Sequence, residues 1–446
     1  MNRHVLSLGM VLMLSACHSG TGGPVMEPGG CGLEPYQWLP RSEVGELLWY
    51  EEDVANRYDA DTMDSFAAMA GPNIPPARYG SQVFMVRYTT QDKGKKVEAT
   101  GMVAVPWSQG GSQKTFPTIL YLHGTCGWAD ACAPSVLKGP TLLIVVQLIS
   151  AQGFVVVAPD YIGMDAAAMP PADRHAYLTI EQTAVGSLDM LPAAHTLLEE
   201  EERTMALPEQ EIYLVGYSQG GHAVFAVDRV APFYNPPLRI QAAVAGIPAV
   251  DLTALAKSDL SKLHEGTRFT LAMLLAHHDW YRAAESLDSI FTSPFADEWP
   301  QTIKTTCSGD VSFQASAVTD LVRADFVDRV LSDRWDELGT LGCSLQENTI
   351  TLSPIQRLRK TPTYFVMGAA DELVPPASQR AAFDTLCEQG HRLQHLECQD
   401  ATHEDTALWA IPEVFAWLQA RVAGEPLDDQ DVCRPNQPVR CSNQPD

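Results

Sequence analysis

The sequence predicts an α/β protein with a doubly wound, mostly parallel β-sheet, because of two observations. Short, fully apolar runs recur along the chain, and helical stretches separate them. Apolar runs of this kind are typical of strands that are covered on both faces, and the alternation indicates helices on both sides of one sheet. The predicted core strands are 118–122, 154–158, 212–215, 240–245 and 363–367.

Other elements are expected before and between these strands. Two β-like runs, 83–89 and 100–105, precede the core strands, and Gln91-Asp92-Lys93-Gly94 between them is typical of a hairpin turn. Helices are predicted at 184–200, 222–230 and 408–422.

The pattern changes between residues 248 and 354, where helix-like pieces at 267–278 and 317–331 occur without a strong strand run. A long insertion between two late core strands is typical of a cap or lid. The expected organisation is a signal peptide (1–16), a tether and N-terminal segment (17–75), the first part of the core (76–247), an inserted helical cap (248–354), the second part of the core (355–422) and a loosely packed C-terminal tail (423–446).

The N-terminus is typical of the export signal of a bacterial lipoprotein. Arg3 precedes a short apolar run at 5–14, and Leu14-Ser15-Ala16-Cys17 follows as a lipobox. We expect a lipid on Cys17, which would anchor the protein to the cell envelope, at the outer membrane. An ordinary signal peptide, which would give a secreted protein, is the alternative. The Gly- and Pro-rich residues 18–32 suit a flexible tether.

Ten cysteines in an exported chain indicate disulfides. Nine remain without Cys17, and none has the C-x-x-C spacing of a zinc site. Sequence alone does not determine connectivity, but proximity favours four pairs and leaves Cys31 over. These pairs are Cys126–Cys132, Cys307–Cys343, Cys387–Cys398 and Cys433–Cys441.

The chain is acidic, with 30 Lys and Arg against 55 Asp and Glu, and its formal net charge is −25. Such a surface favours solubility and repels phosphate backbones, which argues against nucleic acid as a partner. Nothing in the sequence implies a protein partner.

The run Gly216-Tyr217-Ser218-Gln219-Gly220 carries the main candidate for chemistry. It lies between a predicted strand and a predicted helix, which is the context of the nucleophile turn in the α/β-hydrolase fold. Ser218 is the expected nucleophile, because this turn exposes its Oγ at the carboxyl end of the sheet. Glycine is required at 216 and 220 so that the helix can pack against the strand.

A second motif, His123-Gly124-Thr125, ends another core strand. A turn here would direct the next amide toward the nucleophile, so the backbone amides of Thr125 and Gln219 are expected to form an oxyanion hole. We expect His123 to be structural. Asp160 and Tyr161, near the rim of the site, are also expected to brace a loop.

A serine hydroxyl needs a general base, because it is barely nucleophilic at neutral pH. In the α/β-hydrolase fold the chain order is serine, acid, histidine. His403, before the C-terminal helix, is the expected base, and Asp371, after the last core strand, is the expected acid. Glu372 and Asp251 are the alternative acids.

Other histidines fit the role of the base less well. His391 and His395 are expected on a helix, as a surface pair or a weak metal site. His277 and His278 lie in the insertion, and His222, after the nucleophile, is expected to face the neighbours of its helix.

Five motifs together carry a resemblance to a known family: Tyr121-Leu-His123-Gly124-Thr125, Cys132-Ala-Pro-Ser135, Ala158-Pro-Asp160-Tyr161-Ile-Gly163, Gly216-Tyr-Ser218-Gln-Gly-Gly221 and Asp371-Glu-Leu-Val-Pro375. As a set over residues 79–422 they resemble the secretory lipase family (lipase A type), including its bacterial members. The resemblance implies an α/β-hydrolase with an inserted helical cap and a triad of Ser218, Asp371 and His403. Fungal members commonly have an acidic residue at the position of Thr125.

The expected activity is that of a serine carboxylic ester hydrolase, a lipase or esterase, which cleaves an ester or lipid through an acyl-enzyme on Ser218. This chemistry needs no metal or organic cofactor. A serine peptidase or acyltransferase on the same fold is one alternative, with Asp279, Glu285 and Asp288 of the cap as ligands for a substrate amine. A non-catalytic surface lipoprotein is the other alternative.

Overall fold

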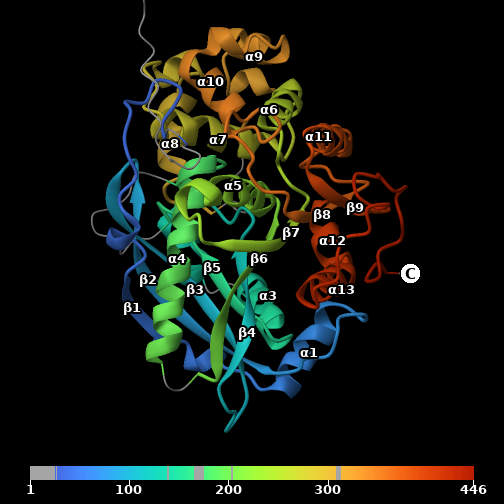
Figure 1. Ribbon diagram of the computed structural model, residues 1–446. Helices are drawn as coiled ribbons and strands as arrows, with labels where there is room; N and C mark the ends of the chain where they lie inside the picture. Colours follow the sequence, from blue (N-terminus) through green and yellow to red (C-terminus); the bar gives the residue numbers. More distant parts are fainter. Residues whose placement is uncertain are drawn as a thin grey trace, which may run out of the picture.

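The structure is a computed structural model that describes residues 26, 28–137, 140–164, 175–201, 204–307 and 313–445. The expected signal peptide and Cys17 lie outside these residues. Figure 1 shows a central sheet with helices on both faces and a group of helices at one end. Among the described helices, none combines the length and apolar character needed to cross a membrane.

The described strands form one nine-stranded mixed sheet in the order β1-β2-β3-β5-β4-β6-β7-β8-β9. The pairs β1–β2, β2–β3 and β3–β5 are antiparallel, and all later pairs are parallel. The strands are β1 (Leu47–Glu52), β2 (Gly80–Asp92), β3 (Lys95–Trp107), β4 (Lys114–Leu122), β5 (Val155–Pro159), β6 (Ala206–Tyr217), β7 (Arg239–Gly246), β8 (Pro362–Gly368) and β9 (Arg392–Cys398).

Side chains alternate between two buried layers along the core strands, as a strand period of two residues requires. On β6, Ile212 and Leu214 join a cluster with helices α4 and α5, whereas Tyr213 and Val215 join a cluster with α3 and α13. The bounds are α3 (Pro140–Ala151), α4 (Ile180–Glu200), α5 (Gln219–Tyr234) and α13 (Ile411–Val422). The sheet is therefore doubly wound, as predicted.

All five predicted core strands and the β2–β3 hairpin are present, whereas β1 and β9 were not predicted. The helix expected at 408–422 is divided into α12 (His403–Trp409) and α13, and the one expected at 317–331 becomes a short 3-10 turn and α9. The remaining helices outside the insertion are α1 (Ala60–Ala70), α2 (Pro134–Leu137) and α11 (Pro376–Glu388).

Between β7 and β8 the chain forms a helical insertion, residues 252–348, at the top of Figure 1. It has its own buried cluster, which includes Leu271, Phe291 and Trp299. Its helices are α6 (Leu252–Ser261), α7 (Thr267–Trp280), α8 (Phe295–Thr302), α9 (Ala324–Leu331) and α10 (Gly339–Asn348).

The disulfide connectivity corrects the sequence prediction. None of the four expected pairs forms, and Cys126, rather than Cys31, is the free cysteine among the described residues. Nearness along the chain misled the prediction, because the fold brings the true partners together from distant segments. The disulfides are Cys31–Cys343, Cys132–Cys307, Cys387–Cys433 and Cys398–Cys441.

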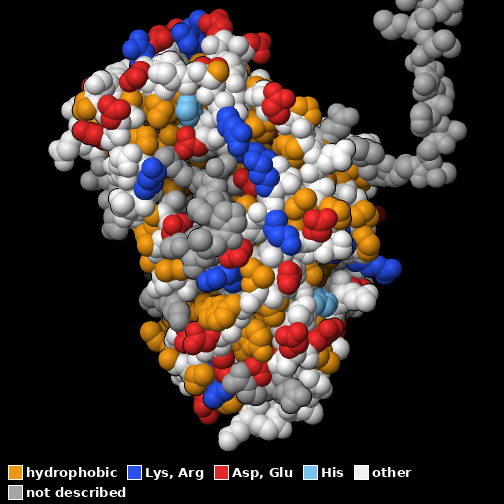
Figure 2. Space-filling view, turned by 90° about the vertical axis from the view of Figure 1, so that its left-hand side faces the viewer, with side chains coloured by type: hydrophobic (Ala, Val, Ile, Leu, Met, Phe, Trp, Pro, Cys, Tyr) orange, Lys and Arg blue, Asp and Glu red, His pale blue; other side chains and the backbone are white. Residues whose placement is uncertain are grey.

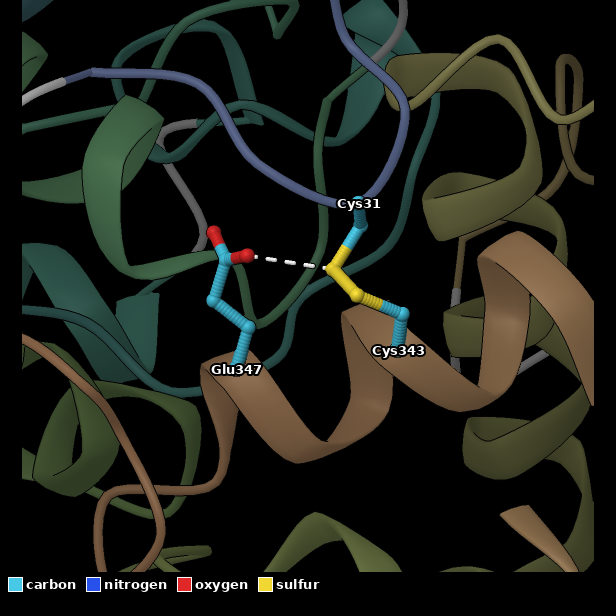
Figure 3. A group of neighbouring side chains, drawn as sticks. All are labelled: Cys31, Cys343 and Glu347. Carbon is cyan, nitrogen blue, oxygen red and sulfur yellow. Dashed lines mark hydrogen bonds between the residues drawn. A yellow bond between two sulfur atoms is a disulfide. The ribbon is translucent and has the colours of Figure 1, made fainter. Parts of the chain in front are cut away.

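Two of these disulfides attach the insertion to the rest of the molecule. Cys132–Cys307 joins it to the loop after β4, and Cys31–Cys343 joins α10 to the N-terminal segment. In Figure 3, Glu347 points at the second disulfide, with its Oε2 3.1 Å from the Cys31 Sγ. This trio has the spacing of a metal site, but the disulfide removes both thiolates that a metal would need.

The other two disulfides bind the C-terminal tail to α11 and β9, so the expected loose tail is wrong. The expected helix for His391 and His395 is also wrong, because His395 lies in β9 and His391 directly before it. Both side chains are buried, and the His395 imidazole contacts Asn436 of the tail. The tail therefore covers the sheet edge that β9 would otherwise expose.

The described surface in Figure 2 mixes acidic and basic side chains, with no continuous basic patch on the described part of that face.

Candidate active site

Ser218 occupies a strained turn between β6 and α5. Its φ is 57°, in the left-handed region that non-glycine residues rarely adopt, and its amide donates to the Gly246 carbonyl at 2.9 Å. Glycine is needed beside it, because a Cβ at Gly220 would lie 1.9 Å from the Leu122 carbonyl oxygen, and one at Gly216 would lie 2.3 Å from the Gly220 oxygen. The close approach of α5 to β4 and β6 thus fixes the serine at the carboxyl edge of the sheet.

The loop after β4 lies against this turn. A Cβ on Gly124 would be 3.8 Å from the Ser218 Cβ. The next residue, Thr125, shares a 2.6 Å hydrogen bond between its Oγ1 and the Tyr177 hydroxyl. Both residues line the same cavity as Ser218, so the loop that carries the Thr125 amide is braced beside the serine.

Gln219 is the first residue of α5, where backbone N–H groups have no partner within the helix. Its side-chain Nε2 donates to the His175 Nε2 at 2.8 Å, and the His175 Nδ1 donates to the Ile162 carbonyl at 3.3 Å. This pattern requires a neutral imidazole, and burial lowers the pKa of His175 to about 3. The neutral ring can therefore hold Gln219 in place at any physiological pH.

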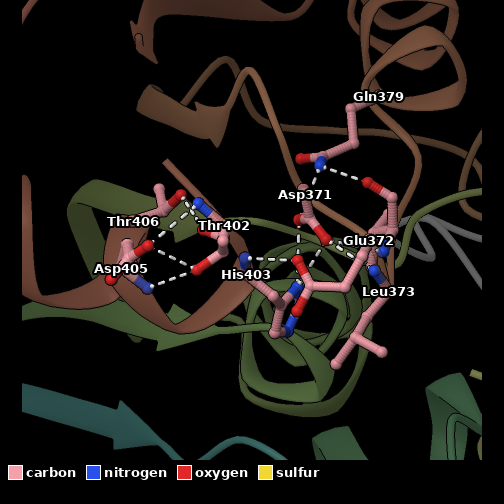
Figure 4. Close-up of polar contacts among 9 residues, drawn as sticks. Asp371, Glu372, Leu373, Gln379, Thr402, His403, Asp405 and Thr406 are labelled. Carbon is pink, nitrogen blue, oxygen red and sulfur yellow. Dashed lines mark hydrogen bonds and ion pairs between the residues drawn. The ribbon is translucent and has the colours of Figure 1, made fainter. Parts of the chain in front are cut away.

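The imidazole of His403 is paired with the carboxylate of Asp371. The His403 Nδ1 lies 3.0 Å from Oδ1 and 2.9 Å from Oδ2 of Asp371, and Figure 4 shows the two side chains facing each other. Both are buried. An ionised carboxylate only accepts hydrogen bonds, so Nδ1 carries the proton and Nε2 is left with a lone pair.

Three further donors fix the Asp371 carboxylate. The amides of Leu373 and Val374 donate to Oδ1 at 2.9 and 2.8 Å, and the Gln379 Nε2 donates to Oδ2 at 3.0 Å. The Asp371 carboxylate therefore both stabilises the turn after β8 and orients the His403 imidazole. Its neighbour Glu372 accepts from the backbone amide of His403 at 3.2 Å and does not reach the ring.

Local capping positions His403 at the start of α12. The Thr402 Oγ1 accepts from the Asp405 amide at 3.2 Å, and Asp405 accepts in return from the Thr402 amide at 3.4 Å. This capping box fixes the first turn of the helix, which sets the direction of the imidazole (Figure 4).

The other candidates have structural partners. Asp251 caps α6 through the Ala254 amide, whereas the carboxylate that contacts the His403 ring is that of Asp371. The His123 imidazole is buried against the carbonyls of Gly124 and Asp160, and burial lowers its pKa to about 4. Asp160 accepts from Thr100 and Ser135, and Tyr161 donates to the His123 carbonyl. These residues brace the loops around the site, as expected.

Two further histidines are buried between the core and the insertion. The His222 Nε2 donates to the Asn348 carbonyl at 2.9 Å, and the His277 Nδ1 pairs with the Ser344 hydroxyl at 3.1 Å. Neither side chain lines the cavity of Ser218.

A cavity of about 500 Å³ brings Ser218 and His403 together. Within the described residues the Ser218 Oγ makes no hydrogen bond, and such contacts are often long before substrate binds. The insertion supplies charged lining residues, Asp259, Glu265 and Arg268. The acidic residues that the peptidase alternative requires, Asp279, Glu285 and Asp288, are not among those that line it.

Sequence reasoning missed several residues that support this site. Tyr177, His175 and Gln379 come from segments without a motif, and only the folded chain places them against Thr125, Gln219 and Asp371. Gln379 alone had a local signal, since it lies eight residues after Asp371 in the helix that begins after the Asp371 turn.

The mixed sheet, the strained serine turn after β6 and the Asp371–His403 pair after β8 and β9 define an α/β-hydrolase. The secretory lipase family model matches residues 133–430, more than half of the chain, and the protein therefore belongs to the secretory lipase family. It is a hydrolase of the lipase and esterase type. Membership of a secretory family together with four disulfides indicates an extracellular protein.

Solved structures share the fold. The rice cell wall degrading esterase LipA from Xanthomonas oryzae is 20% identical, with a TM-score of 0.68 over 87% of this chain and 99% of that chain. Candida antarctica lipase A in its closed state is 17% identical, with a TM-score of 0.63 over 89% of this chain and 86% of that chain. A search of the curated proteins found no match.

Proposed function

We propose that the protein is a serine carboxylic ester hydrolase with Ser218 as nucleophile, His403 as general base and Asp371 as the acid that orients the imidazole. The proposal is carried by the hydrogen bond between Asp371 and the His403 Nδ1, because His403 lines the same cavity as Ser218. The family makes an ester or lipid the natural substrate class.

In the proposed reaction, the His403 Nε2 takes the Ser218 hydroxyl proton while Oγ bonds to the ester carbonyl carbon. The Asp371 carboxylate stabilises the resulting imidazolium and keeps the proton of Nδ1 in place. The alcohol leaves with the proton from Nε2, and a water molecule activated by the same nitrogen then releases the acid from Ser218.

The backbone amides of Thr125 and Gln219 are the proposed oxyanion hole. Gly124 packs against Ser218, and Gln219 begins α5, so both amides belong to backbone that surrounds the serine. Such donors act best when they are fixed before the reaction. The contacts of Tyr177 with Thr125 and of His175 with Gln219 supply this rigidity.

A fluorophosphonate probe and two substrate classes test the proposal. Wild-type protein should be labelled and should hydrolyse p-nitrophenyl butyrate, and Ser218→Ala should do neither. Equal labelling of both proteins would overturn the role of Ser218. Hydrolysis of aminoacyl anilides without ester hydrolysis would favour a peptidase, and the absence of labelling in wild type would favour a non-catalytic lipoprotein.

We also propose that Cys17 carries a lipid anchor. The support is the sequence Leu14-Ser15-Ala16-Cys17 after an apolar run, and the anchor would hold the extracellular enzyme at the cell envelope. Full-length protein expressed in a Gram-negative host should partition into the detergent phase of Triton X-114, and Cys17→Ser should not. Equal partitioning of the two would contradict the anchor.

A further inference from the structure

A second cavity, of about 470 Å³, lies between helices α3 and α13 on one face of the sheet. Its walls include Leu142 and Val145 from α3 and Val414 and Leu418 from α13, and strand β6 contributes Val215. Among the described residues that line it, Glu404 is the only charged one. Its volume is within the range of small-molecule sites, roughly 300–1,000 Å³.

This cavity adjoins the one that contains Ser218, because Tyr217, Glu404 and Ala407 line both. Tyr217 directly precedes Ser218, and Glu404 directly follows His403. The junction between the two cavities therefore lies beside the two residues proposed to act on the ester carbonyl.

The apolar cavity extends away from this junction along the sheet. Val215 lies two residues before Tyr217 on β6, which is roughly 7 Å along a strand. On α13, the lining runs from Ile411 to Leu418, a rise of roughly 10 Å at 1.5 Å per residue. An extended hydrocarbon advances about 1.25 Å per carbon at a bond length of about 1.5 Å. The apolar walls therefore match a chain of roughly eight carbons.

The cavity of Ser218 is less suited to such a chain. The insertion lines it with apolar side chains such as Leu255 and Phe269, but also with Asp259 and an ion pair. In this pair the Arg268 Nη2 donates to the Glu265 Oε1 at 2.7 Å. A hydrocarbon placed against these groups would remove their water without replacing its hydrogen bonds. In the apolar cavity the same chain leaves water without that cost.

We propose that the cavity between α3 and α13 receives the hydrocarbon chain of the acyl group, which enters past Tyr217 and Ala407 from the carbonyl at Ser218. The inference rests on the proposed ester hydrolysis and deepens it: the substrate class is an ester of a medium-chain carboxylic acid. The charged cavity then receives the alcohol portion.

The test compares chain-length preference in matched variants. We expect wild-type kcat/KM for p-nitrophenyl esters to rise from acetate to a maximum near octanoate or decanoate. Ala407→Trp at the junction and Val145→Trp in the wall should each lower the ratio of decanoate to acetate at least tenfold. Ala416→Trp, on an exposed position of α13 outside both cavities, is the size-matched control and should keep the wild-type ratio.

Val145→Ala is a second variant for the case in which a Trp variant does not fold, because the smaller side chain removes atoms and cannot clash. It should shift the acyl chain length with the highest kcat/KM upward by about two carbons. A decanoate-to-acetate ratio that stays at the wild-type value in the folded Trp variants, or an unmoved optimum in Val145→Ala, would overturn the proposal.

A binding measurement separates this proposal from the proposed reaction. Ser218→Ala should bind 1,6-diphenylhexatriene, a neutral fluorophore that emits in apolar surroundings, and 1-decanol should displace it. In the Ser218→Ala protein, the further substitution Val145→Trp should weaken the binding of the fluorophore and of 1-decanol at least tenfold. If no ester is hydrolysed but this binding is found, the chain site stands and the proposed reaction fails. If esters are hydrolysed with an unaltered chain preference in the variants, the chain site fails alone.

Discussion

The carboxyl edge of the sheet and the helical insertion hold their side chains in different ways. At the edge, strained backbone and hydrogen bonds set single positions: Ser218 has a positive φ, and Asp371 accepts from two amides and Gln379. In the insertion, apolar packing around Trp299 and two disulfides hold the helices. The difference teaches that the edge holds single side chains in fixed positions, as the proposed reaction requires. The insertion instead presents side chains such as Arg268 to the cavity that we propose receives the alcohol portion.

The largest expected effect comes from a substitution at the carboxyl edge of the sheet. Asp371→Asn should lower kcat about 10⁴-fold, which corresponds to roughly 5.5 kcal/mol of transition-state stabilisation. An amide can donate to Nδ1 and so favours the wrong imidazole tautomer. Steady-state hydrolysis of p-nitrophenyl butyrate measures the loss.

The matched control is Glu372→Gln, because the Glu372 carboxylate contacts the backbone of His403 rather than its ring. It should cost less than about tenfold in kcat, since the interactions of one exposed charge are worth at most roughly 1 kcal/mol. A greater loss in Glu372→Gln than in Asp371→Asn would exchange the roles of the two acids.

The second effect concerns the attachment of the insertion. Removal of Cys132–Cys307, which closes 175 residues, should lower the free energy of unfolding by about 5 kcal/mol. Removal of Cys387–Cys433, which closes 46 residues, should cost roughly 1 kcal/mol less, because the loop is shorter. Urea unfolding of the two Cys→Ser double variants measures both values.

The two disulfides are also expected to differ in their effect on kcat. Cys132 follows the loop of Thr125, so its loss should also reduce kcat in protein that remains folded, whereas the tail disulfide should leave kcat near wild type. Equal activity in the two folded variants would show that this attachment does not help to hold the loop.

The smallest expected effect is a loss of stability at acidic pH, to which one buried histidine in each region contributes. Burial lowers the pKa of His222 in the core to about 4 and of His277 in the insertion to about 3. Below about pH 6.5 the unfolded chain takes up protons that the folded chain does not, so stability falls as pH falls. Each histidine should contribute roughly 2 kcal/mol of loss between pH 6.5 and 5.

Urea unfolding of His222→Gln and His277→Gln at these two pH values measures the contributions. Each variant should show a smaller difference between pH 6.5 and 5 than wild type, by a similar amount. An unchanged difference in one variant would mean that its histidine has the same pKa in the folded and the unfolded protein.

The core strands and the serine turn were predictable because their signals are local. Continuous apolar runs and the glycines beside Ser218 reflect strand burial and the close packing of a helix on a strand. The positions of His403 and Asp371 followed from strand order alone, and their catalytic roles stay predictions.

Features that depend on distant segments were not predictable. The edge strand β9 and the burial of His395 depend on a tail bound by Cys433 and Cys441. Disulfide pairing depends on which loops meet in space, and the contact of Tyr177 with Thr125 depends on the course of the chain between them. No local sequence pattern predicts such contacts between distant segments.

The disulfide of Cys31 has a consequence for how the protein is made. A chain that leaves the cell N-terminus first presents Cys31 to the oxidising exterior 312 residues before its partner. Until Cys343 emerges, this thiol is exposed to every other cysteine that arrives earlier. Correct export thus favours a host whose periplasm or exterior contains a disulfide isomerase, and recombinant yield should depend on that enzyme more than on the oxidant.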